Sequence, residues 1–401
     1  MTNANDARRI VLQSVSMVPS EQLPLQTALG RFLAEDIVAP HPVPRFDNSG
    51  MDGYAVRTED LAENTKTVLR LQGEVTAGKV FEGSLFPGHT IRITTGSPVP
   101  DKADAVVEQE QVALRNGSIE FAGSPQKGRN IRRCGEDIQK GAVALTKGSR
   151  LDPAALGVLA SLGIQTVTVH RKLRVAVLTT GDEVVDFRKE PAPGQIRNSN
   201  AVSLEGLLKE DGCDVEMLEI AGDTPEDLRR KIAEGLEFDA LVTSGGVSVG
   251  SHDHVLEVLK SLKVDVKFWK VNIKPGMPMA FGIRTSGRVV PVFSLPGNPV
   301  STMVTYIEFV RPGLRKMTGM KEPEVVQTLP AVLGENLRKA DAKRHFVRGI
   351  FGTEKGRIVV RATGSQSSGV LSSLARANCL IIIPENVQNP AAGDQVEIEL
   401  L

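Results

Sequence analysis

Residues 239–262 read DALVTSGGVSVGSHDHVLEVLKSL, and this stretch decides how the second half of the chain is interpreted. The apolar run 240–242 is typical of a buried parallel strand. Four small residues, 243–246, follow it and allow backbone N–H groups to approach a ligand closely. An apolar-periodic segment, 255–262, then predicts a helix whose cap and first turn contain Ser251 and Asp253. Strand, glycine loop and helix N-terminus form a common phosphate site, and the Asp253 carboxylate predicts that a cation accompanies the anion.

The length of 401 residues is too great for one hydrophobic core and predicts about two to four domains. Lys plus Arg and Asp plus Glu both number 48, so no net charge attracts nucleic acid or a membrane. No segment approaches the ~18 apolar residues of a membrane span, and the N-terminus lacks the apolar core of a signal peptide. The three cysteines form no C-x-x-C pair, which argues against a zinc knuckle or a disulfide framework. We therefore expect a soluble cytoplasmic protein with no nucleic-acid or membrane partner.

The first half predicts a discontinuous domain that carries an insertion. Helices are expected at 6–18 and 24–35, followed by a proline-rich link. Short strands separated by Gly and Pro then indicate a β-rich domain; they are expected at 67–71, 89–94, 105–111 and 119–122. A return segment with a helix at 153–162 completes the first domain. The predicted boundaries are 1–43 plus 138–170 for the first domain, and 44–137 for the inserted β-rich domain.

The second half predicts a doubly wound α/β domain at 171–320 and a β-barrel-like domain at 321–401. Strands and helices alternate in the α/β domain, which indicates a parallel sheet with ligands at the carboxyl ends of its strands. Its strands are expected at 173–178, 215–220, 240–242, 264–271 and 289–292, and its helices at 199–211, 225–236, 253–262 and 299–317. Alternating runs predict the strands of the last domain at 328–333, 346–352, 356–361, 378–383 and 395–400.

Acidic and polar loops follow the predicted strands of the α/β domain. Asp182 and Glu183 follow the first strand, where a carboxylate pair can hold Mg²⁺ or a ribose hydroxyl; the alternative is a solvated helix cap. In GQIRNSN, 194–200, Ser199 or Asn200 is first interpreted as a helix N-cap, as is Asp223.

Two more loops strengthen the prediction of a ligand site at this edge. Lys274 in NIKPGMP is held between a strand end and Pro-Gly, and SLPGNPVS, 294–301, forms another strand-to-helix glycine turn. The match of 246–250 to G-x-S-x-G is set aside, because Ser248 lies well beyond the strand end where a nucleophile would sit.

The β-rich domain has its own candidates, each with a structural alternative. Asp47 and Asp52 lie in DNSGMDGYAV and could form Asx turns. The loop TTGSP, 94–98, is equally ambiguous. Arg129, Arg132 and Arg133 form either an anion clamp, which we slightly favour, or a solvated salt-bridge patch.

Taken in order, these motifs resemble those of the molybdopterin molybdenumtransferases, the MoeA family that includes the E domain of gephyrin. The matching motifs are PxFDNSxMDGYAV, RITTGSPVP, GRNIRRCGEDI, TTGDEV, GQIRNSN, TSGGVSVGSHD, IKPGMP and LPGNPVS. The resemblance covers nearly the whole chain. It implies insertion of molybdenum from molybdate into adenylylated molybdopterin, with release of AMP, by a four-domain homodimer. Its active site would lie between the α/β domain of one subunit and the β-rich domain of the other, and a molybdopterin adenylyltransferase is a possible partner.

The resemblance also implies roles for residues at the matching positions. The catalytic set is Asp52, Glu183, Asp223, Asp253 and Lys274, of which Glu183, Asp223 and Asp253 are the expected Mg²⁺ ligands. The substrate-binding set is Thr95, Arg132, Asp137, Ser244, Gly245, Gly246, Ser248, Gly250, Pro296, Gly297, Asn298, Pro299 and Ser368. One departure is Met277, where many relatives have a second basic residue. Oxyanion binding must then depend on Lys274 or on arginines elsewhere.

Two other functions compete with this interpretation. An adenylyltransferase shares the same type of α/β domain and would transfer AMP from ATP without needing molybdate. A scaffold that binds peptides would keep the fold without the activity. The presence of Asp52, Lys274 and the acidic loop residues argues against a purely structural role.

Overall fold

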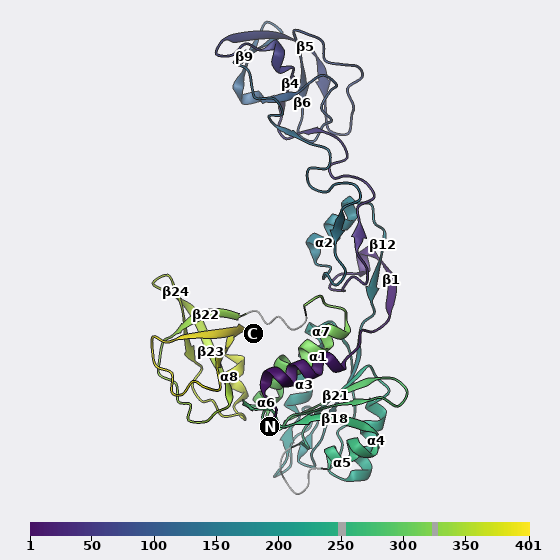
Figure 1. The fold of residues 1–401 in the computed structure, drawn as a ribbon, viewed down its shortest axis with the longest axis vertical. Helices are drawn as coiled ribbons and strands as arrows, with labels where there is room; N and C mark the ends of the chain where they lie inside the picture. Colours follow the sequence, from purple (N-terminus) through teal and green to yellow (C-terminus); the bar gives the residue numbers. More distant parts are fainter. Residues whose placement is uncertain (248–253, 323–327) are drawn as a thin grey trace.

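The computed structural model describes residues 1–247, 254–322 and 328–401. Ser248, Gly250 and Asp253 therefore lie outside the described residues. Figure 1 shows the β-rich domain at one end of an elongated chain, a small linking domain beneath it, and the α/β and C-terminal domains at the other end.

A six-stranded sheet forms the centre of the α/β domain, in the order β16-β13-β17-β21-β20-β18. Its strands are β16 (Asp214–Met217), β13 (Arg174–Thr179), β17 (Ala240–Ser244), β21 (Val290–Leu295), β20 (Ala280–Arg284) and β18 (Val264–Trp269). The first four are parallel, as expected. β20, which the sequence analysis missed, runs antiparallel to both of its neighbours, so this edge of the sheet is mixed.

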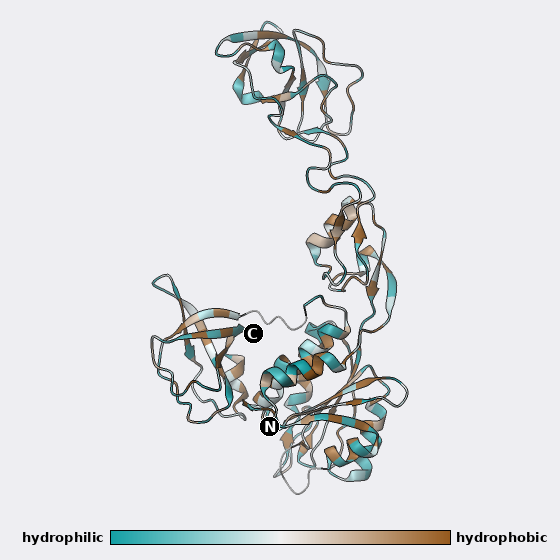
Figure 2. Cartoon of the chain, in the orientation of Figure 1, coloured by the Kyte–Doolittle hydropathy of each residue, from teal (hydrophilic) through white to brown (hydrophobic). Residues whose placement is uncertain are grey.

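Helices cover both faces of this sheet, and alternate residues of each strand point to opposite faces. One face packs against α1 (Ala4–Ser14), α3 (Ser199–Glu210), α6 (Pro299–Thr305), the π turn η4 (Tyr306–Val310) and α7 (Arg311–Met317). The other face packs against α4 (Pro225–Gly235) and α5 (Val255–Ser261). Figure 2 shows hydrophobic colour along the central strands and mixed colours on the surrounding helices. α1 thus packs on the α/β domain, although the sequence placed it in the first domain.

The linking domain contains less helix than the sequence predicted. Its elements are β1 (Ser20–Pro24), η1 (Leu25–Thr27), β2 (Ile37–Val38), β11 (Val143–Leu145), α2 (Pro153–Ser161) and β12 (Thr166–His170). The helix expected at 24–35 is wrong, since only the short 3-10 turn η1 forms. Gly30 adopts φ +78°, and its N–H donates to the Leu151 carbonyl, while the N–H of Ala34 donates to Thr168. Pairing with the return segment therefore replaces the helical hydrogen bonds.

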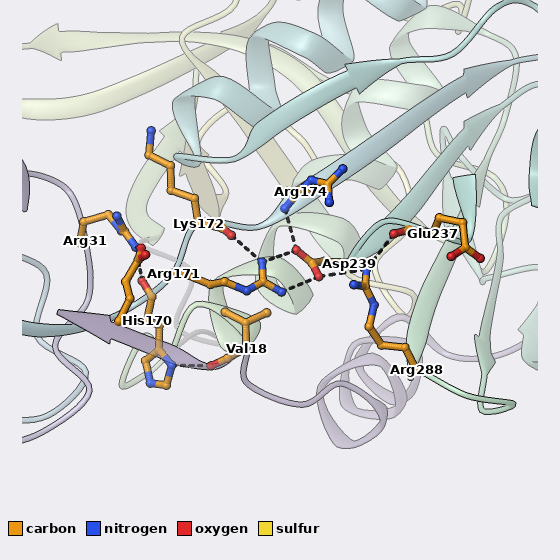
Figure 3. A network of polar contacts seen from close by, with 10 residues as sticks. Val18, Arg31, His170, Arg171, Lys172, Arg174, Glu237, Asp239 and Arg288 are labelled. Atoms are coloured by element: carbon orange, nitrogen blue, oxygen red, sulfur yellow. Dashed lines mark hydrogen bonds and ion pairs between the residues drawn. The ribbon is translucent and has the colours of Figure 1, made fainter. Parts of the chain in front are cut away.

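A polar network fixes the junction between the linking and α/β domains (Figure 3). The Arg171 guanidinium donates to both oxygens of Asp239, at 2.6 and 2.7 Å, and the Arg174 N–H donates to the same carboxylate at 2.8 Å. Arg288 adds an ion pair at 3.2 Å. Asp239 is 4% exposed, and although this burial acts to raise its pKa, the partners together keep the pKa below the usual value. The junction therefore contains a buried, fully paired carboxylate.

The inserted β-rich domain is built on a six-stranded sheet in the order β7-β4-β6-β5-β9-β8. Its elements are β3 (Asn48–Ser49), β4 (Gly53–Val56), η2 (Thr58–Asp60), β5 (Lys66–Val75), β6 (His89–Ile93), β7 (Ala105–Glu108), η3 (Gln109–Gln111), β8 (Val112–Arg115), β9 (Ser118–Ala122) and β10 (Ile131–Arg132). Two separate hydrophobic clusters lie against this sheet, one of which contains Tyr54 and Phe121 and the other Ile91 and Val106. The strand predicted at 105–111 ends at Glu108, and η3 begins at the next residue, Gln109.

The C-terminal domain is a closed barrel of five strands, because β25 pairs with β23 as well as with β26. Its strands match the predicted runs: β22 (Thr328–Leu333), β23 (Arg344–Glu354), β24 (Arg357–Ala362), β25 (Cys379–Ile383) and β26 (Gln395–Leu400), with α8 (Leu371–Ala375) before β25. The short strand β19 (Ile273–Lys274) leaves the α/β domain and pairs with β23. β14 (Val184–Val185) and β15 (Ile196–Arg197) form a two-stranded ribbon. In the described parts of the chain, no helix is both long and apolar enough to cross a membrane.

Candidate active site

Three loops meet at the carboxyl edge of the parallel sheet, after β13, β17 and β21. The first residue of one loop bonds to the last residue of the neighbouring strand. The Thr180 N–H donates to the Ser244 carbonyl at 3.0 Å, and the Gly245 N–H donates to the Leu295 carbonyl at 3.1 Å. The sheet register places Thr179 beside Ser244 and Ser244 beside Leu295. The glycine loop predicted from 239–262 therefore occupies the centre of this edge.

The two glycines of that loop are required by local geometry. Gly245 has φ +99°, and a Cβ there would lie 2.6 Å from the Thr180 carbonyl oxygen. Gly246 has φ +67°, and a Cβ would lie 2.6 Å from Val255 at the start of α5. Side chains would both strain the backbone and clash with the neighbouring loop and helix. Without side chains at these two positions, the backbone of the loop can lie in contact with Thr180 and Val255.

Asn200 ties this loop to the third one, a role that the sequence analysis missed. Its Nδ2 donates to the Ser244 hydroxyl and to the Gly297 carbonyl, both at 2.8 Å. The helix N-cap is Asn198, whose side chain accepts from the Ala201 N–H, so the interpretation of Ser199 or Asn200 as the cap is wrong. The sequence contained a signal for this role of Asn200. Asn198 already caps the helix, so a second asparagine two residues later is not needed as a cap.

The site contains buried polar atoms that have no partner among the residues described. They are Oδ1 of Asn200 and Oγ1 of Thr180, at the inner wall of the loops. Pro296 is also buried, whereas Gly297 and Asn298 are exposed and Pro299 is half-buried. A buried polar atom without a hydrogen bond is costly, so the inner side of these loops is incompletely hydrogen-bonded among the residues described.

Acidic residues lie on two neighbouring loops at the same edge, after β13 and β16. The Asp223 N–H donates to Oδ1 of Asp182 at 3.0 Å, and the Asp182 N–H donates to Oδ2 of Asp223 at 3.3 Å. The carboxylate of Glu183 folds over Gly181, where a Cβ would lie 2.6 Å from it. Thr224 caps α4, so the first interpretation of Asp223 as the N-cap is wrong. Among the described residues no group of three potential metal ligands occurs.

The barrel domain contributes the next wall. The Ser368 carbonyl accepts a hydrogen bond from the Val300 N–H, at 3.1 Å, beside the start of α6. Arg348 is 1% exposed, and its Nη2 donates to the carbonyls of Ser365 and Ser367. Burial lowers the pKa of this guanidinium, and no carboxylate pairs with it in the described parts of the chain. The sequence analysis missed Arg348, which the alternation of β23 places on the face opposite the barrel core that Val347 and Phe351 contact.

Lys274 lies where the α/β domain meets the barrel. It ends β19, and its side chain is 58% exposed, with Nζ 3.6 Å from the Asp341 carboxylate. Met277 is half-buried, and its carbonyl accepts the Val271 N–H at 3.0 Å. The loop thus presents Lys274 as its cation, while the Met277 carbonyl accepts the hydrogen bond that closes the turn.

In the β-rich domain, Asp52 and Thr95 form one unit, a pairing that their separate motifs did not predict. Oδ1 of Asp52 accepts from the Thr95 N–H at 2.6 Å and from the Thr95 hydroxyl at 2.8 Å. These two hydrogen bonds, the backbone one first, lower the pKa of the exposed Asp52 carboxyl. Asp52 is therefore an ionised and firmly oriented acid at neutral pH.

The neighbouring arginines divide between the two alternatives. Arg129 pairs with Glu108 at 3.1 Å, and Arg133 pairs with Asp47 at 2.6 Å, which corresponds to the salt-bridge patch. Arg132 is exposed and forms no ion pair within the described ranges. Asp137 is also exposed, and its N–H donates to Val43. Only Arg132 of the three remains available to bind an anion.

The two groups of candidates do not meet within one chain. Figure 1 places β4 and β6, which flank Asp52 and Thr95, at the opposite end of the molecule from β18 and β21. The linking domain lies between them. A single chain therefore holds two separate parts of the predicted site.

Comparison with known proteins shows the family of the chain. Three family models match the chain. The MoeA N-terminal region (domain I and II) matches residues 2–163, a probable molybdopterin binding domain matches 176–316, and the MoeA C-terminal region (domain IV) matches 330–401. A molybdopterin molybdenumtransferase of Haemophilus influenzae is 40% identical, over 100% of this chain and 98% of the relative. The chain belongs to the MoeA family.

Further MoeA relatives agree in sequence and in fold. Molybdopterin molybdenumtransferase 2 of Mycobacterium tuberculosis is 35% identical over 99% of both chains. The crystal structure of a molybdopterin biosynthesis MoeA protein from Pyrococcus horikoshii has 29% identity and a TM-score of 0.86, with 100% of both chains covered. The resemblance inferred from the motifs is confirmed, as is the multidomain fold. Membership of the MoeA family places the chain in molybdenum cofactor biosynthesis.

Proposed function

We propose that this chain inserts molybdenum from molybdate into adenylylated molybdopterin, releasing AMP and completing the molybdenum cofactor. The observation that carries the proposal is the meeting of three motif segments and a segment of the barrel at one sheet edge: Asn200 joins Ser244 to Gly297, and the Ser368 carbonyl accepts from the Val300 N–H at the start of α6. Residues from three motifs and from the barrel thus line one surface. Relatives that are named for this reaction match over the whole chain.

Each wall suits a different part of such a substrate. Backbone N–H groups of the glycine loop suit a phosphate of the pterin or nucleotide. Lys274 and the Ser368 segment, which the buried Arg348 supports, suit a tetrahedral oxyanion such as molybdate. The substrate's own dithiolene supplies the sulfur ligands of the metal, so the protein needs no Cys or Ser nucleophile. We assign the chain binding, orientation and charge stabilisation as its main tasks.

Mg²⁺ dependence belongs to the same proposal. Glu183 and Asp223 present carboxylate oxygens on adjacent loops, and such oxygens are the donors that Mg²⁺ prefers. Asp253, the third acid of the prediction, lies outside the described residues. When bound, the ion would stabilise the charge that develops on the leaving phosphate. The chain's own contribution is the reciprocal pair of hydrogen bonds in which the N–H of Asp182 and of Asp223 each donates to the other residue's carboxylate, which keeps the two acidic loops together.

A homodimer would unite the two parts of the site. The β-rich domain of one subunit would bring Asp52, Thr95, Arg132 and Asp137 to the sheet edge of the other. The oriented Asp52–Thr95 unit, which is exposed in the chain, supports this arrangement. We also propose that the protein is cytoplasmic and that a molybdopterin adenylyltransferase docks on it.

Subunit complementation tests the proposal directly. Asp52→Asn and Lys274→Met should each abolish transfer while leaving the fold and dimerisation intact. An equimolar mixture of the two variants should regain about a quarter of the wild-type activity, because half of the dimers are mixed and each of these has one of its two sites intact. Mixing Asp52→Asn with Thr95→Ala is the matched control, since both changes lie in the β-rich domain and restore no site. Full activity of either single variant, or no recovery in the first mixture, would contradict the shared site.

A further inference from the structure

Lys274 has two neighbours in the barrel that no motif predicted. The β19–β23 pairing places Lys274 directly beside His345 in the register. Asp341 contacts both residues. Its Oδ1 lies 2.7 Å from Nε2 of His345, and its Oδ2 lies 3.6 Å from Nζ of Lys274. One carboxylate thus connects a cation of the α/β domain to an imidazole of the barrel.

Asp341 is fixed from the barrel side by further contacts. The Lys343 N–H donates to its Oδ1 at 3.1 Å. Its backbone carbonyl accepts from Nζ of Lys339 at 2.9 Å, and that ammonium also binds the carbonyls of Glu385 and Val387. Lys339 is 2% exposed and His345 is 6% exposed, so the base of this arrangement is rigid. Lys274 is the exposed member and the one that needs to be positioned.

The charges of the three groups follow from their surroundings. Burial acts to raise the pKa of Asp341, but the His345 hydrogen bond, the Lys343 N–H and the Lys274 charge outweigh this effect and lower the pKa to about 2. Burial lowers the pKa of His345, although Asp341 opposes this. At neutral pH a neutral imidazole therefore donates to an ionised carboxylate. That carboxylate attracts one face of the Lys274 ammonium and leaves its other donors for a ligand.

We propose that Asp341 and His345 are positioning residues for Lys274, and that they hold its ammonium ready for a tetrahedral oxyanion. This inference rests on the proposed function. The loop 272–278 contains no cation other than Lys274, so the placement of this one side chain sets how the loop binds an oxyanion. Asp341 acts through Lys274, and His345 acts through Asp341.

The steady-state test separates positioning from general stability. Asp341→Asn keeps the shape but removes the charge, and it should raise the KM for molybdate about five- to tenfold with less than a twofold change in kcat. His345→Leu should behave in the same way, whereas His345→Gln, which retains an N–H donor, should restore most of the affinity. Glu354→Gln, at the far end of β23, is the matched control and should change neither constant. If the KM for adenylylated molybdopterin rises instead, the oxyanion at Lys274 is the substrate phosphate.

A second readout does not depend on turnover. Acylation of Lys274, followed by mass spectrometry on the full-length protein, should become at least about twofold faster in Asp341→Asn and His345→Leu, because the ion partner is lost or displaced. His345→Gln and Glu354→Gln should leave the rate unchanged. Unchanged acylation and unchanged KM values in folded Asp341→Asn protein would overturn the inference. Faster acylation in a protein whose wild type shows no molybdate-dependent turnover would support the positioning and reject the proposed function.

Discussion

Replacing Glu399 by Gln should stabilise the protein at neutral pH. Glu399 on β26 is 7% exposed and lies against Glu308 of η4, which is 2% exposed. Arg8 pairs with Glu308 at 2.5 Å, and Oε2 of Glu399 has no hydrogen-bond partner in the described structure. Burial, followed by the charge of Glu308, raises the pKa of Glu399 to about 9 from the ordinary 4.5. The barrel is therefore attached to the α/β domain through a carboxyl that must stay protonated.

The sign of the pH dependence follows from this raised pKa. Below pH 4.5, Glu399 is neutral in both the folded and the unfolded chain, so its protonated carboxyl contributes fully to stability. Above that pH the unfolded chain ionises while the folded chain keeps its proton. The free energy of unfolding then falls by up to about 1.4 kcal/mol per pH unit, until the folded carboxyl also ionises near pH 9. At pH 7 the loss is on the order of 1–3 kcal/mol.

Urea denaturation at pH 5 and pH 8 measures this effect. Glu399→Gln imitates the protonated state, so it should gain about 2–4 kcal/mol over the wild type at pH 8, where one more pH unit adds up to about 1.4 kcal/mol, and little at pH 5. Glu397→Gln, an exposed site on the same strand, is the matched control and should show no such difference. If Glu399→Gln stabilised the protein equally at both pH values, or destabilised it at pH 8, the reasoning would be refuted.

Three further substitutions test the geometry of the fold. Gly245→Ala should destabilise by about 2 kcal/mol or more, because its Cβ would lie 2.6 Å from the Thr180 carbonyl at a positive φ. Gly206→Ala in helix α3, where a Cβ meets open space, should instead stabilise by about 0.5–1 kcal/mol, and equal melting temperatures of the two variants would contradict this account. Asp239→Asn should cost about 3 kcal/mol by leaving Arg171 partly unpaired at the buried junction, as measured by urea unfolding. An unchanged urea midpoint would mean that this network does not hold the two domains together.

Much of the fold could be predicted because local patterns agreed with the tertiary structure. The parallel strands of the α/β domain and all five barrel strands lie close to their predicted positions, since alternating or continuous apolar runs match their burial. The helix expected at 24–35 failed because its periodicity competes with pairing to a segment more than a hundred residues away, for example Gly30 with Leu151. β20 was missed because it follows a proline-rich loop and is short.

The loop residues of the candidate site could be predicted from the sequence, but the residues that hold those loops in place could not. Glycine turns and acidic loop residues have local signatures, so Gly245, Glu183, Asp52 and Thr95 were identified from motifs, whereas the contact between Asp52 and Thr95 was not predicted. Asn200 and Arg348 act through contacts with residues distant in sequence, which periodicity does not reveal. The separation of the two halves of the site could not be inferred from residue patterns, because it depends on how the linking domain spaces them (Figure 1).

The most direct test of the central claim is a transfer assay with purified protein, adenylylated molybdopterin, Mg²⁺ and molybdate at low concentration. AMP release and formation of the molybdenum cofactor are followed together, with and without molybdate. We predict that AMP release requires molybdate and matches cofactor formation one for one. AMP transfer from ATP without molybdate would instead indicate an adenylyltransferase, and absence of both substrate binding and turnover would leave a scaffold; either result would contradict the account.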